Sequence, residues 1–344
     1  MMISLIVYWN KRAAIGTMVL LLLSSCLHAQ QGKTWLRFEG KEGPGKGKHI
    51  VLVSGDDEYR SEEGMPMLGK LLATHYGFTC TVLFPIEPQT GHIVPSFQNN
   101  IPGLEHLASA DLMILLTRFR ELPDEQTKFF HEYLQAGKPI IGLRTATHAF
   151  HYEKNKNSPY AKYHWQSKEA GWEGGFGQKI LGETWVAHHG EHAKEGARAL
   201  IDGLAQQADH PILRGVDDIW VASDVYTVRN LTRDAEVLVW GQPTQGMTAD
   251  SPVIWQKSLM PLAWTKDYQI EGGKKGKVFT TTMGASVDLL SDDLRRLIVN
   301  AVFWSLEKSE IITPALEVGI VGDYKPSMFG FNTFRKGMKV EDFK

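Results

Sequence analysis

The sequence predicts an α/β fold with a doubly wound, mostly parallel sheet and an added β-hairpin region. In the first half of the chain, short apolar runs without polar alternation are separated by stretches of helical spacing. Such runs are typical of strands buried on both faces, and their alternation with helices predicts parallel strands joined by right-handed crossovers. Later, two β-prone runs flank a turn rich in glycine and lysine, which predicts the hairpin.

The elements follow in order along the chain. Four buried strands are expected at residues 50–53, 79–84, 112–116 and 140–143. Ser61 is expected to cap a helix that Gly77 ends, and Pro123 to open a helix that Gly137 closes. Further β-prone runs lie at residues 219–228, 235–240, 261–265 and 278–282, the last two forming the hairpin. Ser291 is expected to cap a final helix with an apolar stripe.

The N-terminus is typical of an export signal. Lys11 and Arg12 precede the apolar run Ala13–Leu23, which is too short to span a bilayer. The run leads to Cys26 in a lipoprotein-like box, so we expect lipidation of Cys26, with cleavage after Ala29 as the alternative. The expected domains are a signal peptide over residues 1–29 (ending before Cys26 in a lipoprotein), a polar tether over 30–48, one domain over 49–310 and a C-terminal tail over 311–344 packed on that domain.

Composition limits the function classes. The 344 residues carry 37 Lys and Arg against 39 Asp and Glu, a balance that argues against a nucleic-acid partner. The two cysteines are Cys26 and Cys80, so no internal disulfide is expected if Cys26 is lipidated or removed. The 10 tryptophans either pack in the core or stack on sugar rings.

The fourth strand runs into a tight turn, Gly142-Leu143-Arg144-Thr145-Ala146. This arrangement resembles the nucleophile elbow of class I glutamine amidotransferases, whose fold is flavodoxin-like and whose catalytic cysteine would stand at Arg144. A guanidinium stays protonated and is not a nucleophile. The resemblance therefore implies the fold without glutaminase activity.

Further motifs, in the same order, are similar to those of the trehalose-utilisation (ThuA-like) family. They are Ile180-Leu181-Gly182 with Trp185 and His188-His189-Gly190, His210-Pro211-Ile212 before Trp220 and Asp224-Val225-Tyr226, Met260-Pro261-Leu262-Ala263-Trp264, Gly276-Lys277-Val278-Phe279, and Met283-Gly284. Arg144 and Ala285 stand where the family pattern has histidines. The resemblance covers residues 49–306 and implies a link to trehalose or related disaccharides, after oxidation of the sugar at carbon 3.

Polar side chains follow three of the expected strands, and parallel strands bring such loops to one rim of the sheet. The side chains are Asp56, Asp57 and Glu58, then Arg118 and Arg120, then Arg144, Thr145 and His148. They form either a structural ion-pair network or a site in which arginines hold ligand oxygens and a carboxylate with a histidine supplies acid–base chemistry. We expect Arg144 to pair with Asp56 or Asp57.

A second constellation is His188-His189-Gly190-Glu191-His192. The spacing of His188 and His192 would suit zinc on a helix, but Gly190 argues against a helix there. The alternatives are a sugar-facing pair and plain loop histidines. Trp172 lies in the irregular stretch just before, which could form a lid.

Together these observations predict an exported enzyme that acts on a saccharide, such as a 3-keto-glycoside. The expected catalytic residues are Asp56, Asp57, His148, His188 and His189, and the expected substrate-binding residues are Glu58, Arg118, Arg120, Arg144, Thr145, Trp172, Asp224 and Trp264. No cofactor is expected to be required. The rival hypotheses are a non-catalytic carbohydrate-binding lipoprotein and a metal-dependent hydrolase with zinc on His188, His189 and His192. The expected location is the periplasm or a membrane anchor in a Gram-negative-type bacterium, and the oligomeric state is left open.

Overall fold

The computed structural model describes residues 33–200 and 209–344, and most of its strands belong to one sheet. The strands are β1 (Trp35–Glu39), β2 (His49–Gly55), β3 (Thr79–Leu83), β4 (Leu112–Thr117), β5 (Ile140–Leu143), β6 (Ala187–His188), β7 (Ala197–Ala199), β8 (Trp220–Val221), β9 (Tyr226–Thr227), β10 (Glu236–Pro243), β11 (Met260–Tyr268) and β12 (Gly276–Thr281). Within the described residues, ten strands form a sheet of order β1-β3-β2-β4-β5-β12-β11-β10-β7-β8, and β6 pairs with β9 separately. The architecture is therefore mixed α/β with one large sheet.

The centre of the sheet is parallel and its flanks are antiparallel. Strands β3, β2, β4, β5 and β12 pair in parallel in that order. The hairpin of β11 and β12 is antiparallel, as predicted, but it is not an added region. Because β12 lies beside β5 with Thr281 opposite Leu143, the hairpin extends the main sheet.

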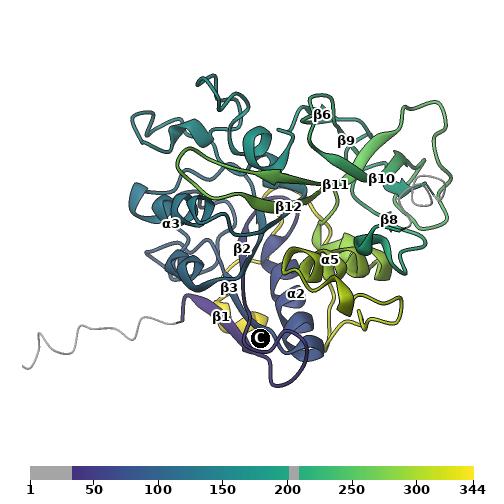
Figure 1. Cartoon of the computed structure of the whole chain (residues 1–344), viewed down its shortest axis with the longest axis horizontal. Helices are drawn as coiled ribbons and strands as arrows, with labels where there is room; N and C mark the ends of the chain where they lie inside the picture. The colour runs from purple at the N-terminus through teal and green to yellow at the C-terminus, as the bar shows by residue number, and fades with distance from the viewer. Residues whose placement is uncertain (1–32, 201–208) are drawn as a thin grey trace, which may run out of the picture. The chain divides into compact units, whose positions relative to one another are not determined.

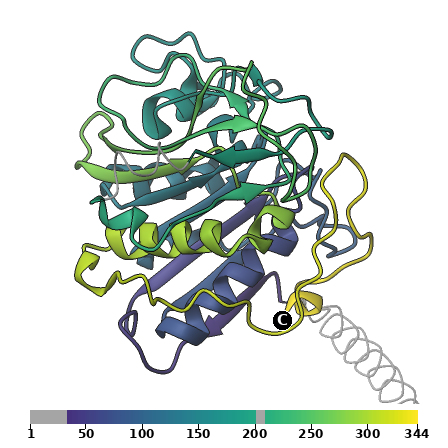
Figure 2. The same ribbon diagram turned by 90° about the vertical axis from the view of Figure 1, so that its right-hand side faces the viewer.

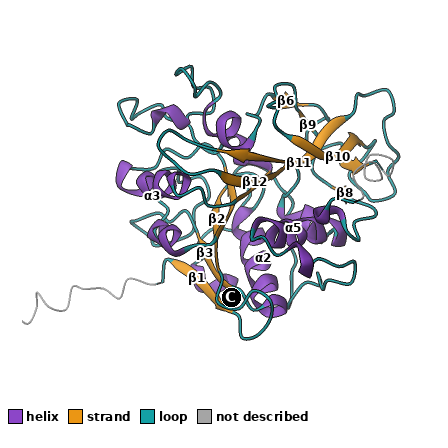
Figure 3. Cartoon of the chain, viewed as in Figure 1, coloured by secondary structure: helices purple, strands orange, loops and turns teal. Residues whose placement is uncertain are grey.

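The helices of the described chain are few and loops are long (Figure 3). The α-helices are α2 (Ser61–Tyr76), α3 (Asp124–Gln135) and α5 (Asp292–Ser305). Short helical turns are η2 (Leu104–Ser109), η3 (Arg144–His148), η4 (Ala161–Tyr163), η5 (Gly177–Leu181), η6 (Pro211–Leu213), η7 (Ser286–Leu290), η8 (Ser309–Ile311) and η9 (Val340–Phe343). None of the helices in the described ranges is long and apolar enough to cross a membrane.

Helix boundaries follow four of the five expected signals, including Pro123 before α3 and Gly137, at φ 66°, just after it. Gly77, at φ 78°, ends α2, and the Ser291 hydroxyl accepts from the Leu294 amide at the start of α5. The prediction for Ser61 is wrong, because Arg60 precedes the helix in a left-handed conformation. Ser61 is the first helical residue, and its hydroxyl instead accepts from the Gly55 and Asp56 amides.

Both faces of the sheet are covered (Figures 1 and 2). Helices α2 and α5 lie on one side, where they pack with Ile50 and Leu52 of β2. Helix α3 lies on the other side and packs with Val51 and Val53. This alternation explains the continuous apolar run of β2, because successive side chains point to opposite faces. The more specific expectation, a doubly wound flavodoxin-like topology, stays a prediction.

Candidate functional site

The turn after β5 holds a buried arginine. Arg144 has a φ of 41°, in the left-handed region, and is fully buried. Its Nη1 donates to the backbone oxygens of Asp224 at 3.0 Å and Thr282 at 2.8 Å. Its Nη2 donates to the Tyr59 hydroxyl and to Asp224 Oδ1, both at 2.9 Å. The guanidinium also lies between the Tyr59 and Tyr226 rings, 4.0 and 4.4 Å from their centroids.

These contacts correct two expectations for Arg144. Its partner is Asp224, on a loop 80 residues away, and not Asp56 or Asp57. Both terminal nitrogens are occupied by protein oxygens, and the side chain has no exposed surface. Arg144 therefore positions Asp224, and its two terminal nitrogens are not available to hold a ligand.

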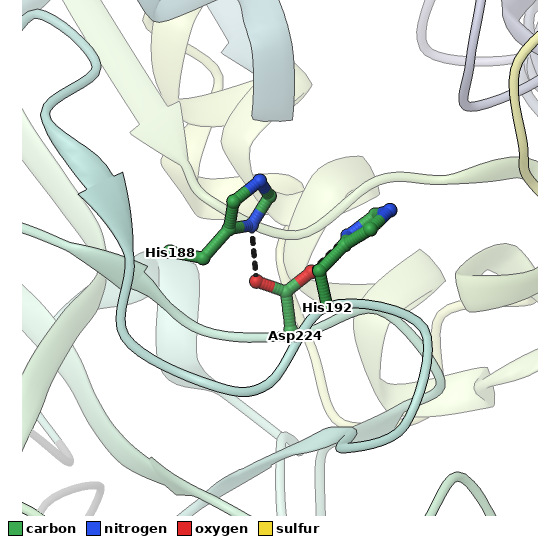
Figure 4. Close-up of side chains that lie close together, drawn as sticks. All are labelled: His188, His192 and Asp224. Atoms are coloured by element: carbon green, nitrogen blue, oxygen red, sulfur yellow. Dashed lines mark hydrogen bonds and ion pairs between the residues drawn. The ribbon is translucent and has the colours of Figure 1, made fainter.

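The Asp224 carboxylate joins Arg144, His188 and His192 in one cluster (Figure 4). Its Oδ2 lies 2.6 Å from His188 Nδ1, and its Oδ1 lies 3.1 Å from His192 Nδ1. Burial by itself would raise the pKa of Asp224, but the charge of Arg144 and the bonds from the two histidines lower it well below its usual range. The group is therefore a fixed anion that orients both imidazoles.

His188 is held beside Asp224 by a short backbone pairing. In β6 it lies opposite Tyr226 of β9, and the amides of His189 and Gly190 donate to the Val225 oxygen. Gly190 permits this approach, because a Cβ there would lie 3.0 Å from the Asp224 Cβ. The His188 side chain is 33% exposed, and its Nε2 has no hydrogen-bond partner within the described residues. An imidazole whose Nδ1–H donates to a carboxylate keeps Nε2 free to accept a proton.

His192 joins two carboxylates. Its Nδ1 contacts Asp224, and its Nε2 lies 2.9 Å from Glu58 Oε1. The hydrogen bonds that His192 donates to Asp224, and then to Glu58, raise its pKa to about 9. Its ring centroid lies 4.6 Å from that of His188. The protonated His192 imidazolium therefore lies beside the partly exposed His188 imidazole.

The loop after β2 also contacts the loops after β4 and β5, through an ion pair and a hydrogen bond respectively. Arg118 Nη1 contacts Asp57 Oδ1 at 2.9 Å, and both side chains are partly exposed. The Thr145 hydroxyl donates to Asp56 Oδ2 at 2.5 Å, while Asp56 Oδ1 accepts from the Glu58 amide at 2.7 Å. Burial and the nearby Asp57 raise the pKa of Asp56. Asp56 thus fixes the loop after β2, and Asp57 with Arg118 forms its partly exposed rim.

His148 lies beneath this rim as a neutral ring. Burial, followed by the charges of Arg118, Arg144 and His188, lowers the pKa of His148 well below its usual range. The rings of Phe119 and Trp185 lie 5.1 and 5.4 Å from it. With 3% of its surface exposed, it is a floor to the site.

Four predicted site residues are not brought into this cluster. Arg120 is buried and donates to the Arg118 and Phe97 backbone oxygens. Trp264 is fully buried, with Nε1 donating to the Leu181 oxygen at 2.7 Å. Trp172 packs in the core beneath the irregular stretch, and the ring of His189 bonds the Ser258 oxygen. The reason is the same in each case, because each side chain is held by a backbone oxygen or a packed core elsewhere.

Aromatic residues that the sequence pattern did not single out also shape the cluster. They are Tyr59, Tyr226, Trp185 and Phe329. Tyr226 closes the Asp224-Val225-Tyr226 motif, so its place in that motif was the available signal. Phe329 lies in the tail, where no pattern in the sequence connects it to His192.

The cluster also offers donors for a metal. One atom each from His188, His192 and Asp224 lie within 4.8 Å of one another, and two histidines with one carboxylate are a common ligand set. Glu58 would then be the outer carboxylate that orients His192. Arg144, however, shares Asp224 Oδ1, and its charge opposes a cation there. His189, a member of the predicted zinc set, points to Ser258 instead.

Comparison with known proteins defines the family. The model of the trehalose utilisation (ThuA) family matches residues 96–305. The chain belongs to the ThuA family. The match includes the elbow, His188, His192 and Asp224, whereas Asp57, Glu58 and the C-terminal tail lie outside it.

Two solved structures of ThuA-like proteins match this chain at low identity. One from Parabacteroides merdae has 15% identity and a TM-score of 0.47, with 82% of this chain and 100% of that chain covered. Another from Bacteroides uniformis has 14% identity and a TM-score of 0.45, with coverage of 80% and 98%. Among curated proteins, none matches this chain.

Proposed function

We propose that this ThuA-family chain is an enzyme that removes a proton next to a ketone in an oxidised saccharide, with a 3-keto-glycoside as substrate. The observation that carries the proposal is the pairing of His188 with the buried Asp224 at 2.6 Å. A half-exposed imidazole oriented by a buried carboxylate is an arrangement suited to a general base. The family description, trehalose utilisation, supports a disaccharide-derived substrate.

In this proposal, His188 Nε2 takes the proton from the carbon between the ketone and the glycosidic carbon. The electron pair of that C–H bond places negative charge on the ketone oxygen. When this electron pair returns toward carbon, it expels the glycosidic oxygen, which receives the proton from His188. The products are an unsaturated ketone and a free sugar. Asp224 stays ionised and keeps the imidazole in the required orientation.

Positive charge around the base would stabilise the developing negative charge. Arg118 is partly exposed on the rim, and His192 carries a proton shared with Glu58 and Asp224. Fixed donors of this kind lower a barrier because they need no rearrangement as charge develops. His148, buried and neutral, contributes an apolar floor instead of a second base.

Turnover of a panel of plain and 3-keto disaccharides tests the proposal. We expect wild type to act on the oxidised sugars alone and His188→Gln to lose roughly 10²–10⁴-fold in kcat. His189→Gln is the matched control, since its ring bonds the Ser258 oxygen, and should keep wild-type kcat. Sugar binding without turnover would favour the non-catalytic alternative.

Metal analysis of the same preparation separates acid–base chemistry from a metal hydrolase. We expect full turnover after treatment with a chelator, because Arg144 occupies the carboxylate that a metal would share. Activity lost with the chelator and restored by zinc would contradict the proposal.

We also propose that the chain is exported. The proposal rests on Lys11, Arg12, the short apolar run and Cys26, all of which lie outside the residues that the structure describes.

A further inference from the structure

A segment beyond the family match returns to the site. Residues 323–335 follow the matched range 96–305 and run beside the start of α2. The Gly330 amide donates to the Glu58 oxygen at 2.9 Å, and Arg60 donates to the Gly330 oxygen and the Thr333 hydroxyl. We call residues 327–333 the strap.

The strap has further anchors away from the site. Both the amide and the hydroxyl of Ser327 donate to the Glu63 carboxylate, at 2.6 and 2.9 Å. Phe329 is 7% exposed and packs against Tyr59, with ring centroids 5.2 Å apart. The strap is therefore fixed by hydrogen bonds and a buried anchor, so the side chains between these anchors have defined positions.

Two phenylalanines of the strap lie close to the cationic side chains of the site. The Phe329 ring lies 5.8 Å from that of His192, the imidazole that pairs with Glu58. The Phe331 ring lies 4.8 Å from the guanidinium carbon of Arg118, whose other neighbour is Phe119 at 4.4 Å. The strap thus contacts both cationic groups that the proposed reaction uses.

Phe331 is unusual among these aromatic residues because it is 49% exposed. The other contacts of Arg118 would already orient it, since Asp57 pairs with it and Phe119 stacks on it. An exposed ring fixed beside an arginine and a carboxylate offers an apolar surface next to polar groups, which is the combination that ligand sites use.

We propose that Phe331 is a specificity-determining residue that contacts the saccharide, and that the strap supplies this contact from outside the family-matched region. The inference rests on the proposed function for its ligand class. The flat apolar face of a pyranose would lie on the Phe331 ring while Arg118 holds the sugar oxygens. Phe329 is the buried anchor that sets the position of Phe331.

Calorimetric titration and turnover with the same disaccharide panel test the inference. We expect Phe331→Ala to weaken binding or raise KM roughly tenfold, with kcat within about twofold and the melting temperature unchanged. Phe331→Trp should restore binding because it keeps an aromatic face. Met328→Ala, at an equally exposed position of the strap, should bind as wild type.

The outcomes separate the two proposals. Saccharide that binds wild type without turnover, but binds Phe331→Ala more weakly, overturns the proposed reaction and supports the strap contact. Phe331→Ala that binds and turns over as wild type overturns the strap contact and leaves the reaction intact. Wild type that binds no saccharide at millimolar concentration overturns both.

Discussion

Arg144 shows how one residue can change the use of a turn. Its left-handed backbone after β5 places the side chain between two tyrosine rings, at the position where the resemblance to glutamine amidotransferases implies a cysteine. The remaining thiol of the described chain, Cys80, is buried in β3, and burial raises its pKa. The structure therefore presents no thiolate at this turn and uses the guanidinium to hold Asp224 in place.

Replacing Arg144 by lysine should destabilise the fold. We expect Arg144→Lys to lower the free energy of unfolding by about 3 kcal/mol, because a lysine ammonium cannot donate to all four oxygens that now accept from the Arg144 guanidinium. Urea unfolding measures the change. Arg233→Lys, at an exposed position, should stay within about 0.5 kcal/mol of wild type. An Arg144→Lys variant as stable as wild type would contradict this structural role.

Glu62 should make stability depend on pH. It is buried, neither carboxylate oxygen has a hydrogen-bond partner in the described structure, and burial raises its pKa to about 8. Between about pH 4.5 and pH 8 the folded chain keeps a proton that the unfolded chain has released, so stability falls as the pH rises.

Thermal melts at two pH values test the Glu62 account. Glu62→Gln should match wild type near pH 5 and exceed it at pH 8.5 by at least about 1 kcal/mol. The exposed Glu125→Gln should follow wild type at both values. A Glu62→Gln variant with the same pH profile as wild type would show that the carboxyl is not buried as described.

At the scale of elements, long apolar runs were predictable and very short strands were not. Strands β2 to β5 have enough consecutive apolar residues to indicate burial on both faces. The predicted run 219–228 instead divides into β8 and β9, two residues each, in different sheets. The loop between them carries Asp224, so local pattern could not place the central carboxylate.

Pairing partners were the other unpredictable feature. The hairpin of β11 and β12 follows from its turn, but the neighbour of β12 is set by packing across 130 or more residues of sequence. No local pattern in β5 (Ile140–Leu143) or β12 (Gly276–Thr281) indicates that they are neighbours, and only the folded sheet makes them adjacent. This pairing matters for function, because Thr282, just after β12, accepts from Arg144.

The cap of α5 offers a test at this scale. The Ser291 hydroxyl accepts from the Leu294 amide at 3.3 Å, so Ser291→Ala should lower the free energy of unfolding by about 1 kcal/mol. Ser309→Ala, at a partly exposed serine without a side-chain hydrogen bond in the described structure, is the control. Equal denaturation midpoints for the two variants would argue against the cap.

In the whole molecule, the site joins segments from nearly the entire described chain. The loops after the parallel strands were predictable, since such strands bring their carboxyl ends to one edge. The convergence of His188, Asp224 and Phe329 was not, because irregular segments carry no periodic signal that fixes their path. The sequence therefore indicated the rim with Asp57 and Arg118, but not the pairing of His188 with Asp224.

Export is a prediction about the whole chain. Labelled palmitate should be incorporated into the wild type, and Cys26→Ala should abolish the label while Cys80→Ala keeps it, because Cys80 is buried in β3. A chain exported without label and cut after Ala29 would contradict lipidation and support ordinary signal cleavage.

Deuterium exchange tests the central claim most directly. In D₂O, wild type should place deuterium on the carbon next to the ketone of a bound 3-keto-glycoside, as followed by nuclear magnetic resonance, because His188 removes that proton. His188→Gln should bind the sugar and show no exchange above the rate in buffer, while His189→Gln exchanges as wild type. Exchange or turnover that persists in His188→Gln, or wild type that binds the sugar with neither exchange nor turnover, would contradict the account.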